Sequence, residues 1–173
     1  MNERIAVVPY DPEWPRRFEA ERALLERVLA PWLEGGIHHI GSTAIPGIGA
    51  KPIIDMMAGV RDLERAREAF KPLGEVSYVY APHRPGIAHH FAKPSPQAWE
   101  YGLHLTEPGS DLWRERLAFR DALRRDPDLA AKYETLKLRL AQDHGDDPTA
   151  YTTGKREFVV QVLTSVGETL GRR

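Results

Sequence analysis

The sequence of 173 residues predicts an α+β fold, a mixed sheet flanked by helices with a C-terminal helical half. Short apolar runs typical of strands alternate with amphipathic stretches up to about residue 107. From about residue 108 onward, apolar residues recur only at helical spacing. No flexible linker separates these parts. We therefore expect a single domain over residues 1–173, with a strand-bearing half at about 1–107 and a helical half at about 108–170.

The strand-bearing half is expected to begin with a short strand at 5–8 and a helix that Asp11 and Pro12 open and that Gly35 and Gly36 end. Further strands are expected at 37–40, 52–60, 76–80, 87–91 and 100–105, with a helix at about 62–73. The strand at 52–60 is apolar on both faces apart from Asp55, which predicts a central place in the sheet.

Three capping signals define the helical half. Ser110 is a good N-cap for the helix that follows it. The pairs Asp126-Pro127 and Asp147-Pro148 each place a capping carboxylate before a proline at the first helical position. We expect three helices in this half.

Composition excludes several classes of protein. The net charge of −1 gives no basic field for nucleic acid or an anionic membrane. The absence of cysteine excludes a disulfide scaffold, a thiolate zinc site and a thiol nucleophile. No run approaches the roughly 20 apolar residues of a membrane span, and the N-terminus lacks the apolar core of a signal peptide. We expect a soluble, cytoplasmic protein with no nucleic-acid or membrane partner; its oligomeric state stays open.

The candidate site lies in the stretch HIGSTAIPGIGAKPIID, which ends at Asp55. Gly41 and Ser42, followed by Thr43, form a tight corner after a strand, and such a corner suits the binding of a phosphate group. A carboxylate on the next strand suits a divalent metal that bridges phosphates. The alternative is an ordinary loop in which Asp55 pairs with an arginine or caps a backbone amide.

This stretch closely resembles the signature of the GrpB family, bacterial proteins that also occur as a domain fused to a dephospho-CoA kinase. The resemblance extends through VVPYDPEWPRRFEAE, GLHLTEPGSDLWRERLAFRDALRRDPDLAAKYETLK and YTTGKREF, and so covers nearly the whole chain. It implies a nucleotidyltransferase-like fold, in which a Gly-Ser turn binds nucleotide phosphates and strand carboxylates bind metal.

One position departs from the pattern that this superfamily implies. Active nucleotidyltransferases usually carry two carboxylates two residues apart on a strand, where they hold two Mg²⁺ ions on one face. Met57 stands where the partner of Asp55 would be, and its thioether is no ligand for a hard cation. A single metal held by Asp55 and the phosphates of the substrate stays open.

A histidine and three basic residues complete the candidate site. His104, near the third carboxylate position that the resemblance implies, suits a metal ligand or a general base; alternatively it is a satisfied core or surface residue. Lys51 precedes the Asp55 strand, whereas Arg120 and Lys155 match the family motifs FRD and YTTGK. All three can neutralise phosphate. The alternative is structural, with Arg120, Asp121 and Lys137 pinning helices to the sheet.

Three functions fit these residues. The first is a metal-dependent nucleotidyltransferase, using Mg²⁺ or Mn²⁺, that moves a nucleotidyl group from an NTP to a small-molecule acceptor. Asp55 and His104 would then be catalytic and metal-binding residues. The second is a non-catalytic module with a degenerate metal site that binds a nucleotide or a phosphorylated metabolite. A single-metal hydrolase built on Asp55, His104 and His90 is a third possibility.

Overall fold

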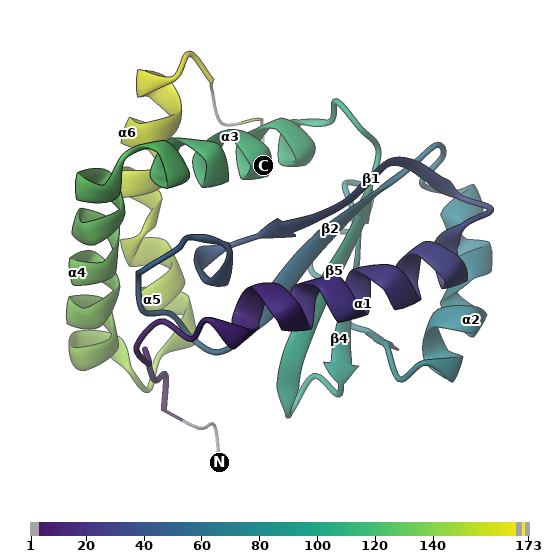
Figure 1. Cartoon of the computed structure of the whole chain (residues 1–173), viewed down its shortest axis with the longest axis horizontal. Helices are drawn as coiled ribbons and strands as arrows, with labels where there is room; N and C mark the ends of the chain where they lie inside the picture. The colour runs from purple at the N-terminus through teal and green to yellow at the C-terminus, as the bar shows by residue number, and fades with distance from the viewer. Residues whose placement is uncertain (1–3, 169–170, 172–173) are drawn as a thin grey trace.

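The computed structural model describes residues 4–168 and 171 and contains a five-stranded mixed sheet with helices on both faces (Figure 1). The strand order is β1-β2-β5-β4-β3, and only β2 and β5 are parallel. The strands are β1 (Leu33–Ile40), β2 (Ile54–Val60), β3 (Val79–Tyr80), β4 (His89–Pro94) and β5 (Trp99–Thr106). The central place predicted for the Asp55 strand is confirmed, because β2 lies between β1 and β5.

One face of the sheet is covered by α1 (Glu13–Leu29) and α2 (Phe70–Glu75). The helix α1 begins at Glu13 with Pro12, not Asp11, at its N-cap position. The carboxylate of Asp11, one residue before the N-cap, still accepts the backbone N–H of Glu13 at 2.9 Å. The main core fills the space between these helices and the sheet. Its large members are Trp14, Phe18, Leu25, Leu29, Ile37, Ile54, Met56, Leu73, Tyr78, Phe91, Leu103 and Leu105.

The opposite face is covered by the helical half, which consists of α3 (Asp111–Arg125), α4 (Pro127–His144), α5 (Pro148–Gly154) and α6 (Arg156–Ser165). All three predicted caps are made. Ser110 accepts the N–H of Trp113, Asp126 that of Leu129, and Asp147 those of Thr149 and Ala150. The third expected helix is interrupted at Lys155 and forms both α5 and α6.

Several predicted elements differ in the structure. Residues 5–8 form no strand; Val8 makes an isolated bridge to Ala50. Gly35 and Gly36 lie inside β1 rather than at the end of a helix, at φ of 82° and 81° where the pairing register with β2 shifts. Glycine tolerates this left-handed conformation, so these residues form an irregularity of the strand. The helix expected at 62–73 is a 3-10 turn, η2 (Arg65–Ala69), followed by the short α2.

The loop between β1 and β2 packs into the helical half. Ile45 and Ile48 belong to a second core cluster with residues of α3, α4 and α6. Gly49 is held at both backbone groups, since its N–H donates to the Glu134 carboxylate and its carbonyl accepts from Lys137. The loop that carries the candidate site is therefore fixed by helices that follow it by more than 70 residues.

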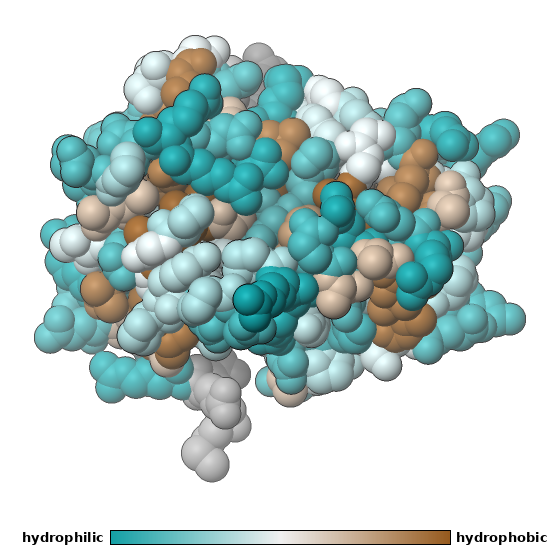
Figure 2. Space-filling view, viewed as in Figure 1, coloured by the Kyte–Doolittle hydropathy of each residue, from teal (hydrophilic) through white to brown (hydrophobic). Residues whose placement is uncertain are grey.

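Apolar residues on the face shown in Figure 2 are scattered among hydrophilic ones. In the described part of the chain, no helix is both long enough and apolar enough to cross a membrane.

Candidate functional site

A cavity of about 310 Å³ opens between the sheet and the helical half. Its lining comes from the loop after β1, the loop between β3 and β4, the first residues of β2 and β5, and the helices α3 to α6. Of the residues predicted for the site, the cavity wall contains Gly41, Ser42, Thr43, Lys51, Asp55 and Lys155. Arg120 and His104 do not contribute to it. The motif around Asp55 and the distant YTTGK motif therefore meet in one cavity.

Asp55 points into this cavity between two glycines. A Cβ at Gly41 would lie 3.0 Å from Oδ2 of Asp55, and a Cβ at Gly102 would lie 2.6 Å from Oδ1. Within the described residues, no side chain or backbone group forms a hydrogen bond or ion pair with this carboxylate. Burial raises the pKa of Asp55, while Arg116, Lys51 and Lys155 oppose the rise. Asp55 is thus a partly exposed carboxylate that packs closely against a glycine on either side.

The corner at Ser42 is a 3-10 turn, η1 (Ser42–Ala44), that Gly41 enters at a φ of 73°. The Thr43 hydroxyl donates to the carbonyl oxygen of Ile53 at 2.9 Å and bonds Nε2 of His39 at 2.9 Å. Thr43 therefore ties the corner to the start of β2 and also lines the cavity, and its role in phosphate binding stays a prediction. The hydroxyl of Ser42 has a different neighbour, the phenol of Tyr133 from α4, and it opposes the rise in the pKa of Tyr133 that burial causes.

His39, which bonds the Thr43 hydroxyl, is buried. Its ring stacks on Phe18 with the ring centroids 4.8 Å apart. Burial, followed by the charges of Arg124 and Arg120, lowers the pKa of His39 to about 4. The imidazole is therefore neutral at pH 7, and it serves as a hydrogen-bonded core group.

Three lysines, Lys51, Lys137 and Lys155, line the same cavity as Asp55. The Nζ atoms of Lys51 and Lys155 lie 5.3 Å and 4.6 Å from the ring centroid of Tyr151, and Nζ of Lys137 lies 4.9 Å from that of Tyr133. Burial and the repulsion between these ammonium groups lower the pKa values of Lys137 and Lys155 to about 8. Such repulsion is relieved by an anion bound between the lysines.

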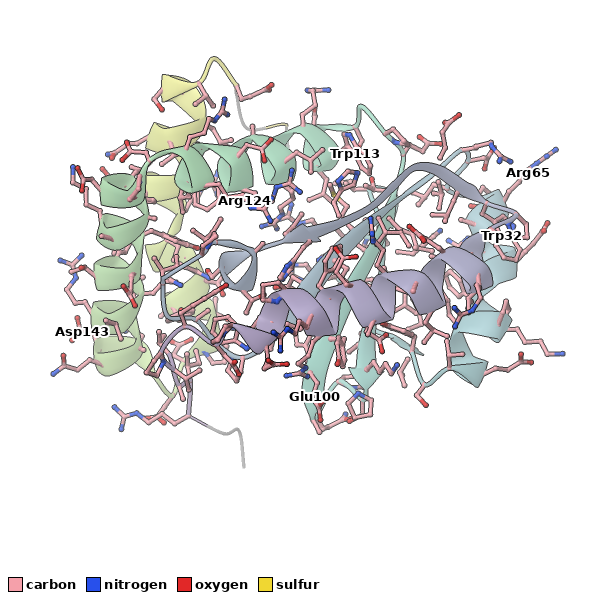
Figure 3. The ribbon with its side chains drawn as sticks, viewed as in Figure 1. Trp32, Arg65, Glu100, Trp113, Arg124 and Asp143 are labelled. Atoms are coloured by element: carbon pink, nitrogen blue, oxygen red, sulfur yellow. The ribbon has the colours of Figure 1, made fainter. Side chains whose placement is uncertain are left out.

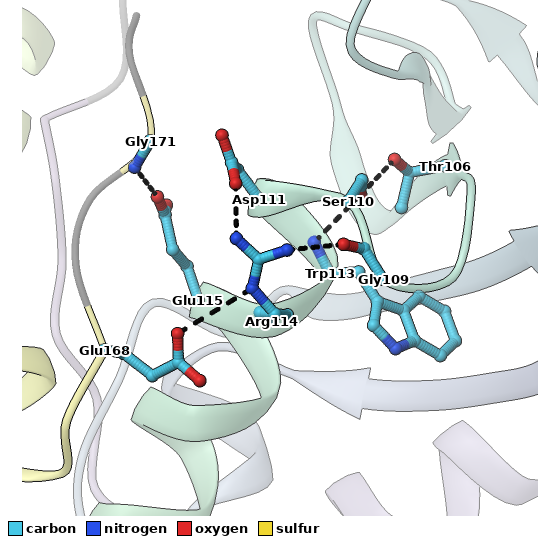
Figure 4. Close-up of polar contacts among 9 residues, drawn as sticks. All are labelled: Thr106, Gly109, Ser110, Asp111, Trp113, Arg114, Glu115, Glu168 and Gly171. Atoms are coloured by element: carbon cyan, nitrogen blue, oxygen red, sulfur yellow. Dashed lines mark hydrogen bonds and ion pairs between the residues drawn. The ribbon is translucent and has the colours of Figure 1, made fainter.

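Arginines extend the positive charge of the cavity. Arg84, Arg116 and Arg156 also line it, and the acidic groups of the lining are Asp55 and Glu115. Glu115 is occupied elsewhere, because its Oε1 accepts the backbone N–H of Gly171 (Figure 4). Across the part of the chain that the structure describes, Lys51, Lys137, Lys155 and Arg116 form no ion pair with a carboxylate.

Arg120 supports the corner from outside the cavity. Its Nη1 donates to the carbonyl oxygen of His39 at 3.3 Å, and its guanidinium pairs with Asp121 at 2.8 Å. Arg124, one turn further along α3, donates to the carbonyl oxygen of Ala44 at 2.9 Å (Figure 3). The helix-surface pair of Arg120 and Asp121 is the structural alternative that the sequence left open.

His104 lies on the same sheet face as Asp55 but in a separate, smaller cavity of about 10 Å³. The ring of His104 is 4.6 Å from that of His90, and His83, Arg84 and Arg116 complete the polar lining. Burial, with His90 and Arg116, lowers the pKa of His104 well below its usual value. This space holds about one water molecule. His104 is therefore a neutral group separated from the larger cavity.

The cavity fits a divalent metal poorly as a resident cofactor. Met57, two residues after Asp55 on the same face, is fully buried beside His104 in the parallel register. Among the described residues, no three histidine or carboxylate side chains are placed to hold a metal ion together. One carboxylate surrounded by cations does not make a preformed Mg²⁺ site. The arrangement suits an anion instead.

Sequence reasoning missed Arg116, Gly102 and Trp99, all of which border Asp55 or its cavity. Tyr133 is buried in the core of the helical half and also lines the cavity. One signal was available: Tyr133 and Lys137 are four residues apart and so share a face of α4. Nothing local distinguishes Arg116 from the other arginines of α3.

Comparisons with known proteins identify the family. The chain matches the family described as "GrpB protein" over residues 4–165. It is 34% identical to "Glutamate-rich protein GrpB" of Alkalihalophilus pseudofirmus over 168 residues, 94% of this chain and 95% of that protein. The crystal structure of the conserved protein GrpB from Enterococcus faecalis superposes with a TM-score of 0.83 at 29% identity, covering 94% of this chain and all of that one.

A more distant structure shares only the fold. The GLD-2/RNP-8 complex aligns with a TM-score of 0.61 at 13% identity, covering 90% of this chain and 52% of the matched chain. The fold class expected from the sequence is therefore confirmed. This chain belongs to the GrpB family and has a nucleotidyltransferase-like α+β fold.

Proposed function

We propose that this chain binds the phosphate groups of a nucleotide, or of another phosphorylated small molecule, in the cavity between its sheet and its helical half. One observation carries the proposal. Lys51, Lys137, Lys155 and Arg116 converge on the cavity, and among the described residues none of them forms an ion pair with a carboxylate. Collecting like charges in a partly buried space is unfavourable unless a polyanion neutralises them.

Different residues of the cavity contact the phosphates in different ways in the proposed complex. The corner at Gly41 and Ser42 offers backbone N–H groups and a hydroxyl to phosphate oxygens. Lys51 and Lys155 supply positive charge from the other side of the cavity. The volume of about 310 Å³ lies at the lower end of the range for small-molecule sites, roughly 300–1,000 Å³.

Nucleotidyl transfer is the second candidate. Asp55 favours it, because this carboxylate lies in the cavity with no partner among the described residues. Mg²⁺ or Mn²⁺ would then enter with the phosphates of the ligand and be shared with Asp55, since the described side chains offer one carboxylate for it. Met57 excludes the usual arrangement of two strand carboxylates, so we place binding before catalysis.

A thermal-shift titration with ATP, GTP, CTP, UTP and inorganic tripolyphosphate tests the proposal. A ligand at a hundredfold excess over its Kd stabilises the native state by about 2.7 kcal/mol, which gives a clear shift. Lys155→Gln should weaken binding about tenfold or more, as expected when a charge-assisted contact is lost. Lys132→Gln, at an exposed position on α4, is the matched control and should bind normally. An absence of binding by every probe, or equal binding by both variants, would contradict the proposal.

Asp55→Asn separates the two candidates. Without metal, the carboxylate repels phosphate, so the variant should bind tripolyphosphate more tightly than the wild type does. If the site uses a divalent ion, Mn²⁺ should strengthen nucleotide binding to the wild type and leave the variant unchanged. A response to Mn²⁺ that is equal in both proteins would remove Asp55 from any metal-dependent role.

A further inference from the structure

The cavity has an exposed tryptophan at its rim. Trp99, the first residue of β5, is 39% exposed and lines the cavity, whereas tryptophan is usually highly buried. The hairpin before it is closed by the N–H of Ala98, which donates to the backbone and side-chain oxygens of Ser95. The indole is thus presented to the cavity by a defined turn.

Trp99 is also close to the candidate reactive carboxylate. A Cβ at Gly102 would lie 3.1 Å from Nε1 of Trp99 and 2.6 Å from Oδ1 of Asp55. Both groups therefore border the space that the absent side chain of Gly102 leaves free. The ring of His90 contacts the indole at a centroid distance of 5.1 Å and an interplanar angle of 67°. Within the described residues, the indole N–H has no hydrogen-bond acceptor.

The other aromatic rings of the cavity are covered. Lysine ammonium groups lie over Tyr151 and Tyr133. Phe119 packs against Tyr133 and Phe158, with centroid distances of 5.2 Å and 6.4 Å. Among the described residues that line the cavity, Trp99 is the aromatic side chain that is exposed, whereas Phe119 is half-buried and Tyr133 and Tyr151 are buried.

We propose that Trp99 is a stacking platform for a planar heteroaromatic group of the ligand, and that this contact makes the site prefer nucleotides to polyphosphate alone. The inference rests on the proposed phosphate-binding function and names the class of ligand. The phosphates occupy the end near Ser42 and the lysines, the base lies on the indole at the rim, and Asp55 lies between these two ends. Aromatic stacking of this kind is tolerant of base identity.

The test compares the affinities of ATP, GTP, CTP and UTP with that of tripolyphosphate, by isothermal titration calorimetry. Wild-type protein should bind at least one nucleotide about tenfold or more tightly than tripolyphosphate, the effect expected of one stacked base. Trp99→Leu should bring this ratio close to one and leave tripolyphosphate affinity unchanged. Trp99→Phe should retain most of the preference. Trp113→Phe is the matched control, because Trp113 packs on His38 outside the cavity and should keep the wild-type ratio.

Indole fluorescence gives an independent readout. The preferred nucleotide should quench the emission in the wild type and in Trp113→Phe, but not in Trp99→Phe. A wild-type ratio of one, or a ratio that Trp99→Leu leaves unchanged, would overturn the stacking and preserve the phosphate site. Failure of every probe, tripolyphosphate included, to bind the wild type would overturn both proposals.

Discussion

Lys137 and Lys155 should make the folded chain more stable as the pH rises from 7.5 to 9. Burial and neighbouring ammonium groups lower their pKa values to about 8 from the ordinary value of 10.5. In the unfolded chain both lysines return to the ordinary value. Between these two values the unfolded state binds more protons than the folded state, so the free energy of unfolding increases with pH.

The expected size follows from these values. Moving from pH 7.5 to pH 9 should add about 1 kcal/mol for each lysine, given a folded pKa near 8 and an unfolded pKa near 10.5. Few other groups interfere in this window. The chain has no cysteine, and the effect of histidines with lowered pKa values is complete above pH 6.5. Tyr133, whose pKa burial raises, becomes destabilising only above about pH 10.

Urea unfolding at pH 7.5 and pH 9, at constant ionic strength, measures the effect. Wild-type protein should gain about 2 kcal/mol. Lys137→Met should lose about half of this gain, because Lys137 is 2% exposed and its charge is removed. Lys132→Met, on the exposed side of α4, should behave like the wild type. A free energy of unfolding that stays constant or falls in the wild type would refute the reasoning about the buried lysines.

Three further predictions concern the support of the site. Acidification from pH 7 to pH 5 should lower the free energy of unfolding by about 2 kcal/mol through His39, because its pKa in the folded chain is about 4. Urea unfolding should show a smaller decrease in His39→Gln, and an equal decrease would contradict the prediction. Gly102→Ala should destabilise the chain by about 1–3 kcal/mol through overpacking against Asp55, whereas Gly74→Ala, where a Cβ meets nothing within 4 Å, should not; equal unfolding midpoints would count against this. Met57→Asp should lower the melting temperature, because it buries a second carboxylate beside that of Asp55. Mn²⁺ should reverse part of this decrease, and no response to Mn²⁺ would show that the two carboxylates cannot share an ion.

Much of the fold is predictable because its signals are local. Ser110, Asp126 and Asp147 cap the helices that they were predicted to cap, since a cap needs only a side-chain oxygen and the next few backbone N–H groups. Gly35 and Gly36 were misassigned because a glycine that ends a helix and a glycine that forms an irregular strand both need a positive φ. The sequence alone does not distinguish these two uses.

The candidate site is predictable only where it is contiguous. Gly41, Ser42 and Asp55 share one motif and one cavity wall. Arg116 and Arg120 are four residues apart on α3 and have the same chemistry, yet Arg116 lines the cavity and Arg120 holds the carbonyl oxygen of His39. The two arginines lie one helical turn apart, and the way α3 packs on the sheet determines which of them faces the cavity.

Because the loop between β1 and β2 packs into the helical half, the two halves of this chain are not expected to fold as separate fragments. Ile45 and Ile48 complete the small hydrophobic cluster of the C-terminal half, while the same loop shapes the pocket. A fragment ending near residue 107 would therefore lose one wall of the pocket, and the remaining helices would expose an incomplete apolar cluster. Limited proteolysis should accordingly find the two parts unfolding cooperatively, and a ligand that bridges them should protect both from cleavage.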